Sequence, residues 1–238
     1  LVLAGAGSGK TRVITQKIAY LVEDCGFQPR NIAAITFTNK AAKEMQERVG
    51  KLLPRSPIGQ FQISTFHSLG VRILREEAKA LGYKPRFSIF DSTDCAGIIG
   101  DLAGTVDKYT LRAIQSTISN WKNALVGPER AAQIAQSEHE ALAAKVFVSY
   151  EATLKAYQAV DFDDLIRMPV ELFTRNDEVR DKWQNRLRYL LVDEYQDTNA
   201  CQYELLKLLT GVRAQFTAVG DDDQAIYAWR GADIENLK

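Results

Sequence analysis

Hydrophobic and polar positions along the chain form two kinds of pattern. Short, nearly continuous apolar runs of strand length occur at 31–37, 61–65, 188–193 and 215–220. Apolar residues with helical spacing cover 13–21 and 40–53, and a further helix is expected over 200–209. Continuous apolar runs are typical of strands buried on both faces, and strands that alternate with helices indicate a parallel sheet. Both ends of the chain are therefore predicted to be α/β.

The middle of the chain has a different pattern, because strand-like runs become scarce between about 67 and 173. Helical segments follow one another there, at 69–81, 92–102, 110–125, 128–136, 138–159 and 162–173. Turn signals at Gly82–Pro85 and Gly127–Pro128 separate some of them, and Pro128 suits the first position of a helix. The pattern predicts a helical insertion within an α/β domain.

The composition limits the class of protein but does not indicate a function. The chain has 238 residues, 30 basic and 30 acidic, and 46% of its residues are hydrophobic, which is typical of a globular protein. Even charge does not exclude nucleic acid, because a local basic stripe can lie within a neutral total. No apolar run approaches the about 20 residues of a membrane span, and a cytoplasmic protein is expected.

The three cysteines, Cys25, Cys95 and Cys201, lack the paired spacing of a zinc site or a disulfide framework. They are expected to be small core residues. Leu1 already lies within the first apolar run, so we expect the natural chain to extend upstream of it.

The first twelve residues, LVLAGAGSGKTR, carry the strongest chemical signal, since an apolar run leads into a glycine-rich turn and Gly-Lys-Thr. Glycines allow successive backbone N–H groups to point at an anion, and the following helix directs its positive end to the same place. The positive charge of Lys10 can bind the β- and γ-phosphates, and the hydroxyl of Thr11 can ligate Mg²⁺. A plain strand-to-helix turn is the alternative. The predicted nucleotide-binding residues are Ala4, Gly5, Ala6, Gly7, Ser8, Gly9, Lys10 and Thr11.

A second signal is the apolar run that ends in Asp193-Glu194. In phosphate-loop enzymes a strand-end carboxylate belongs beside Mg²⁺ and its neighbour can polarise the attacking water, so Asp193 is predicted as metal ligand and Glu194 as base. Without the phosphate loop, such a pair would be read as a solvated turn.

The run 216–231, FTAVGDDDQAIYAWRG, also ends in acids. Gln224 could hold the water near the γ-phosphate, while Tyr227, Trp229 and Arg230 suit stacking on unpaired bases with backbone phosphate contacts. Core packing is the alternative for the aromatic residues. The acidic triplet 221–223 is read as a tight polar turn in preference to a second metal site.

Two further strand ends, at 36–40 and 64–68, combine hydroxyl, aromatic and basic or amide groups at the ligand side of a parallel sheet. Phe37, Asn39, Thr65 and His67 are candidates for phosphate, sugar or base contacts. A structural histidine is the alternative for His67, and His139 is expected to be a solvated residue at a helix start.

Six stretches occur in this order: AGAGSGKTR, TFTNKAAKEM, ISTFHSLG, DFDDLI, LLVDEYQDTN and VGDDDQAIYAWRGAD. Together they resemble the ordered motifs of superfamily 1 DNA helicases of the UvrD, Rep and PcrA type, most closely the Rep branch. The resemblance covers the whole chain. It implies a RecA-like P-loop NTPase core at 1–66 and 175–238, with an all-helical insertion subdomain at 67–174.

The resemblance also implies residue roles. Lys10 and Thr11 would hold phosphate and Mg²⁺, Asp193 would bind Mg²⁺, Glu194 would be the base, and Gln224 would sense the γ-phosphate. Arg12 would lie against the adenine. The residues placed along single-stranded DNA are Phe37, Thr65, His67, Tyr227, Trp229 and Arg230.

The function implied is that of a bacterial ATP-dependent 3′ to 5′ helicase acting on single-stranded and partial-duplex DNA, with Mg²⁺, in DNA replication and repair. An adenine-reading glutamine segment would precede Leu1. Arginine fingers would come from a second RecA-like domain, so residues 1–238 are expected to be inactive alone. The alternatives are a helicase-nuclease subunit and a nucleotide- and DNA-binding module without turnover.

Overall fold

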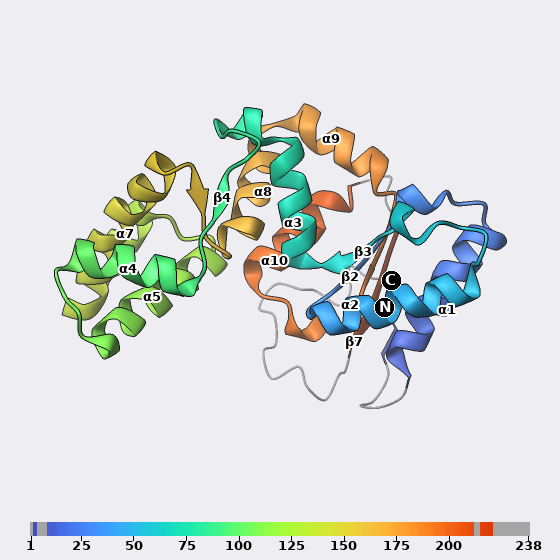
Figure 1. Cartoon of the computed structure of the whole chain (residues 1–238), viewed down its shortest axis with the longest axis horizontal. Helices are drawn as coiled ribbons and strands as arrows, with labels where there is room; N and C mark the ends of the chain where they lie inside the picture. Colours follow the sequence, from blue (N-terminus) through green and yellow to red (C-terminus); the bar gives the residue numbers. More distant parts are fainter. Residues whose placement is uncertain (1, 4–8, 212–214, 221–238) are drawn as a thin grey trace. The chain divides into compact units, whose positions relative to one another are not determined.

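A computed structural model describes residues 2–3, 9–211 and 215–220 (Figure 1). These residues form two compact units. Unit 1 comprises the described parts of 1–69, 176–198 and 206–238, and unit 2 comprises 70–175 and 199–205. Each unit has its own hydrophobic core.

Unit 1 is built on a five-stranded sheet in the order β1-β7-β6-β2-β3, and every strand pair is parallel. The strands are β1 (Val2–Leu3), β2 (Ile32–Thr36), β3 (Gln62–Thr65), β6 (Tyr189–Val192) and β7 (Gln215–Gly220). All residues of β2 and β6 are buried, as their continuous apolar sequences predict. In Figure 1 blue strands from the start of the chain lie beside red strands from its end. The predicted parallel α/β sheet is therefore confirmed.

The helices of unit 1 supply the other half of its core. Helix α1 (Lys10–Glu23) and α2 (Asn39–Leu52) bury Ile14, Met45 and Val49 against the sheet residues Ile63 and Leu191. Short 3-10 turns lie at Pro29–Asn31, Ile58–Gln60 and Tyr195–Asp197, the last labelled η4. Helix α9 (Asp177–Arg186) was not predicted, because it is almost wholly polar and buries only Trp183.

Unit 2 is mainly helical. Its elements are most of α3 (Phe66–Glu76), the 3-10 turn Ala78–Leu81, α4 (Ser92–Ala103), α5 (Lys108–Asn123), α6 (Pro128–Ile134), α7 (Glu138–Ala156), α8 (Asp164–Arg175) and the first part of α10 (Ala200–Leu209). Helices α4 to α7 surround a core in which Trp121 stacks on Phe147 with ring centroids 6.0 Å apart. The predicted series of helices is confirmed in its main members.

Three details of unit 2 differ from the prediction. The helix expected at 138–159 ends at Ala156, since Gln158 has a left-handed backbone with φ of 51° that turns the chain. The freed residues form β5 (Ala159–Val160), which pairs in parallel with β4 (Ser88–Ile89). The helix expected at 69–81 begins at Phe66 and gives way to a 3-10 turn after Glu76.

Close packing explains one glycine of unit 2. A Cβ on Gly70 of α3 would lie 1.8 Å from the backbone oxygen of Leu165 in α8, so only glycine allows this approach. None of the helices in the described residues combines the length and the apolar character needed to cross a lipid bilayer.

The predictions for two cysteines and for His139 are confirmed, and the prediction for the third cysteine is wrong. Cys95 and Cys201 are buried, as expected, but Cys25 is exposed. The prediction for Cys25 is wrong because α1 ends at Glu23 and the turn through Gly26, with φ of 72°, carries this residue to the surface. His139 is an exposed residue in the first turn of α7, as predicted, and its Nε2 lies 3.1 Å from the Thr117 hydroxyl.

Candidate nucleotide site at the carboxyl edge of the sheet

The structure describes only part of the predicted site. The predicted residues Ala4, Gly5, Ala6, Gly7, Ser8, Gln224, Tyr227, Trp229 and Arg230 lie outside the described residues, as does the acidic triplet 221–223. The described candidates are Gly9–Arg12, Phe37, Asn39, Thr65, His67, Asp193 and Glu194.

Sheet topology brings the described candidates to one edge. The segments that follow β1, β2, β3 and β6 leave the carboxyl ends of parallel strands, which all open on the same side of the sheet. Register supports this placement, because Ile35 of β2 lies level with both Ser64 of β3 and Val192 of β6. Residues far apart in the sequence are therefore gathered at the side where such folds bind ligands.

The start of α1 suits an anion. Gly9 caps the helix in a left-handed conformation, with φ of 78°, which favours glycine. No side chain caps this end of the helix, and no acidic residue lies in its first turn. Its first N–H groups and the positive end of its dipole are thus suited to a phosphate. Lys10, only 9% exposed, adds a positive charge at the same point.

Asp193 and Glu194 follow directly after β6. The N–H of Asp193 donates to the carbonyl of Ile35 at 3.0 Å, which extends the sheet by one residue. The Asp193 carboxylate, on a residue only 4% exposed, accepts from the N–H of Glu194 at 2.9 Å. Glu194 itself has a left-handed backbone with φ of 51°, which is uncommon for a residue with a side chain and is concentrated at functional sites.

The electrostatics of Asp193 favour a cation. Burial raises the pKa of this carboxyl and the neighbouring Glu194 charge raises it further, while the Lys10 ammonium acts in the opposite direction. Burial and Glu194 likewise raise the pKa of Asp197, again against Lys10. The Lys10 charge therefore acts on both carboxylates. A divalent cation would relieve the remaining repulsion.

The residues present fit Mg²⁺. The hydroxyl of Thr11 and the carboxylate of Asp193 are oxygen ligands, which Mg²⁺ prefers, and Mg²⁺ uses few protein ligands when phosphates and water complete its shell. Among the described residues no cluster of three or more histidine, cysteine or acidic side chains forms a metal site of its own.

The described DNA candidates lie at or just after the ends of β2 and β3. Phe37 is partly buried and packs on Phe66 with ring centroids 5.3 Å apart, while Asn39 is the exposed first residue of α2. Thr65 is buried, and its hydroxyl accepts from the N–H of Ser68 at 3.1 Å. His67 is partly exposed in the first turn of α3. Thr65 thus orders the helix that carries His67.

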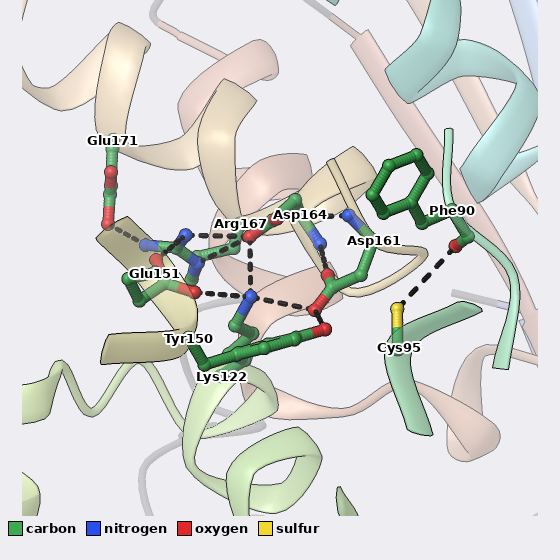
Figure 2. A network of polar contacts seen from close by, with 9 residues as sticks. All are labelled: Phe90, Cys95, Lys122, Tyr150, Glu151, Asp161, Asp164, Arg167 and Glu171. Carbon is green, nitrogen blue, oxygen red and sulfur yellow. Dashed lines mark hydrogen bonds and ion pairs between the residues drawn. The ribbon is translucent and has the colours of Figure 1, made fainter. Parts of the chain in front are cut away.

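Unit 2 contains a network of buried charged residues (Figure 2). The sequence did not predict this network, although the DFDDLI stretch at 161–166 is part of it. Lys122, fully buried, lies 2.6 Å from Glu151, 2.8 Å from Asp161 and 3.0 Å from Asp164. Arg167 contacts Asp164, Glu151 and Glu171 at 2.6 to 2.8 Å.

The geometry of this network orders the start of α8. Asp164 N–H donates to Asp161 Oδ1 at 2.9 Å, and Asp161 N–H donates to Asp164 Oδ2 at 3.1 Å, which is a reciprocal cap. The spacing of the two aspartates could have revealed the cap from sequence. Lys122 could not be foreseen, because lysine is rarely buried without partners and its partners lie 29 to 42 positions away, at Glu151, Asp161 and Asp164.

Burial affects the pKa values of Asp161, Asp164 and Lys122, with different outcomes. It raises the pKa of Asp161 to about 6, reinforced by the Asp164 charge. It would raise the pKa of Asp164 as well, but Lys122 and Arg167 outweigh it and hold this pKa below its usual range. For Lys122 burial favours the neutral form, yet the surrounding carboxylates prevail and raise the pKa of the ammonium.

The sheet order, the glycine-capped helix after β1 and the carboxylates after β6 define an α/β fold of the P-loop type, consistent with a RecA-like core. The sequence pattern of the UvrD/REP helicase N-terminal domain matches residues 1–238, and the chain belongs to this family. The expected family membership is confirmed.

Similarity to individual proteins supports this family assignment. The chain is 58% identical over 240 residues to the ATP-dependent DNA helicase Rep of Salmonella typhimurium and, equally, to that of Escherichia coli. It is 46% identical over 241 residues to the ATP-dependent DNA helicase PcrA of Staphylococcus aureus. These matches cover 100% of the chain but only 36% of each Rep protein and 33% of PcrA, so the chain spans about a third of their length.

Proposed function

We propose that the protein containing this chain is an ATP-dependent DNA helicase that moves 3′ to 5′ along single-stranded DNA, using Mg²⁺-ATP. The observation that carries the proposal is the convergence of the α1 start and the Asp193-Glu194 pair at one sheet edge, in a chain 58% identical to Rep helicases. Partial-duplex DNA is the proposed substrate and the bacterial cytoplasm its location, in DNA replication and repair.

Each described residue then has a chemical task. Lys10 and the α1 N-terminus hold the phosphates, and Thr11 and Asp193 hold Mg²⁺, which supplies charge neutralisation at the transferred phosphoryl group. Glu194 orients the attacking water and accepts its proton. Arg12, an exposed residue of the first turn of α1, is proposed to lie against the adenine.

The DNA path is proposed along the same edge. Phe37, Asn39 and His67 present an aromatic ring, an amide and an imidazole after neighbouring strands, and these groups suit bases, sugar and phosphate. Tyr227, Trp229 and Arg230 are proposed to extend that path, and Gln224 to sense the γ-phosphate. Thr65 is proposed as a DNA contact too, in addition to ordering α3.

Residues 1–66 and 175–238 are proposed as one RecA-like domain interrupted by the helical subdomain 67–174. A second RecA-like domain in the whole protein would supply arginine fingers, which are worth on the order of 10³ to 10⁵ in rate in other phosphate-loop enzymes. Residues 1–238 alone are therefore proposed to bind nucleotide and DNA without DNA-stimulated turnover. A helicase-nuclease subunit, with a nuclease domain elsewhere in the protein, is the alternative for the whole chain.

The test compares strand displacement by the full-length protein on duplexes with a 3′ or a 5′ single-stranded tail. ATP-dependent unwinding of the 3′-tailed duplex is expected, with little on the 5′-tailed one. Unwinding only from the 5′ tail would overturn the polarity, and nuclease cleavage of the labelled strand would favour the helicase-nuclease alternative. ATP hydrolysis by residues 1–238, with and without single-stranded DNA, tests the division of the site.

A further inference from the structure

Gln196 connects the proposed base with the end of a neighbouring strand. It lies in η4 (Tyr195–Asp197), and its Nε2 donates a hydrogen bond to Oε2 of Glu194 at 2.5 Å. A carboxylate only accepts hydrogen bonds, so the NH₂ end of the amide must face Glu194. The carbonyl end then faces Gly220, the last residue of β7.

Gly220 leaves the space that this amide occupies. A Cβ at position 220 would lie 2.6 Å from Oε1 of Gln196, whereas the backbone nitrogens of Gln196 and Tyr195 would be 3.4 and 3.5 Å away. Gly220 is not among the glycines with positive φ, so its backbone does not itself require glycine. An alanine here would therefore displace mainly the Gln196 amide, and the strand could keep its course.

The position of the Glu194 carboxylate needs such support. Its side chain begins from a left-handed backbone, with φ of 51° and ψ of 44°, and has three rotatable bonds. Proton abstraction requires the accepting oxygen to be held within hydrogen-bond reach of the water. Because Gln196 binds Oε2, it restricts the carboxylate while Oε1 stays able to accept from water.

We propose that Gln196 is a positioning residue for the hydrolysis step: it holds the carboxylate of Glu194 in place, and Gly220 provides the room for its amide. This inference rests on the proposed function, in which Glu194 is the base. Gln196 has no contact with the reacting atoms in this role and acts only through Glu194.

The first test is Gln196→Met in the full-length protein, which keeps the length of the side chain and removes the donor. The kcat of ATP hydrolysis stimulated by single-stranded DNA should fall roughly ten- to a hundredfold, the range expected for a displaced catalytic group. The KM for ATP and the affinity for single-stranded DNA should stay unchanged. Gln46→Met is the matched control, because Gln46 donates a side-chain hydrogen bond to the Ile63 carbonyl at 2.7 Å in the same unit.

A double variant separates positioning from a general structural role. If Gln196 acts through Glu194, adding Gln196→Met to Glu194→Gln should leave the residual kcat unchanged, because the group it positions is already lost. Gly220→Ala should lower kcat in the parent protein and have no further effect in Gln196→Ala, where the shorter side chain avoids the close contact.

The outcomes distinguish the inference from the function on which it rests. Normal hydrolysis by Glu194→Gln would overturn the base assignment itself. A large loss in Glu194→Gln with parental kcat in Gln196→Met would overturn the positioning role and leave the base in place. A Gln196→Met variant that lowers kcat or nucleotide affinity equally in both backgrounds would also overturn the positioning role.

Discussion

The acidic side chains of the two units differ in the cations that surround them. In unit 2, Glu151, Asp161 and Asp164 form direct ion pairs with the buried Lys122, and Arg167 adds a second cation. In unit 1, Asp193 and Glu194 are sequence neighbours at a strand end, and the Lys10 charge offsets only part of what burial and repulsion do to Asp193. The first set is paired with cations of its own unit, and the second lies at the carboxyl edge of the sheet, where the nucleotide site is proposed.

The direction of the pKa shifts follows this difference only for some of the carboxylates. Lys122 and Arg167 hold the pKa of Asp164 below its usual range despite complete burial, while the pKa of Asp193 stays raised. Asp161 also keeps a raised pKa although it is paired with Lys122, so a raised pKa by itself does not identify a carboxylate without a cation. Acidic clusters are therefore informative about function only after the cations within reach have been identified.

Of the substitutions that test this difference between the units, one at Lys122 is expected to have the largest effect. Lys122→Met should leave Asp161 and Asp164 buried without their shared cation and reduce the local free energy of unfolding of unit 2 by roughly 3–5 kcal/mol. Amide hydrogen exchange in α5 and α8 of the full-length protein measures this. Lys145→Met on the exposed face of α7 is the control and should stay within about 0.5 kcal/mol. Equal effects of the two would mean that the network contributes little to stability.

Glu194→Gln probes the other unit. It keeps the shape and hydrogen-bonding capacity of the side chain but removes the proposed base, so ATP should still bind while turnover falls by roughly 10² or more. Hydrogen-exchange protection of β6 should be retained, which contrasts with Lys122→Met. The matched control Glu44→Gln changes an exposed glutamate of α2 and should hydrolyse ATP at the parental rate.

Asp193→Asn should act on the metal rather than on the fold. Removal of one charge lowers the affinity for a cation, so the Mg²⁺ concentration that supports half-maximal hydrolysis should rise by at least about tenfold. A magnesium titration of ATPase activity with the full-length protein measures it. An unchanged requirement for Mg²⁺ would remove Asp193 from the metal site.

The last expected effect is a pH dependence within unit 2. Because the folded pKa of Asp161 is raised to about 6, its contribution to stability is fully present below its unfolded pKa and is lost as the pH rises through about 6. Asp161→Asn should abolish this part of the pH dependence, on the order of 1 kcal/mol for each pKa unit. Hydrogen exchange of α8 at pH 4 to 7, compared between parent and variant, measures it. Identical slopes would contradict the raised pKa.

The sequence by itself determined the class of fold and most of the elements. Continuous apolar runs marked β2 and β6 because strands buried on both faces are mainly apolar. Gly9-Lys10-Thr11 marked the start of α1 because an anion-binding helix start favours glycine and a cation. Family membership could be inferred from the order of six short stretches. These signals are local, and each is read within a few residues.

Tertiary structure decided what depends on distant partners. Helix α9 is held to its unit by one buried residue, Trp183, and β4 pairs with β5 across about 70 residues of chain. Lys122 is buried because carboxylates from two other elements surround it, and Gln196 meets Gly220 only where η4 approaches the end of β7. Such contacts depend on the folding of the whole unit, so no window of sequence contains them.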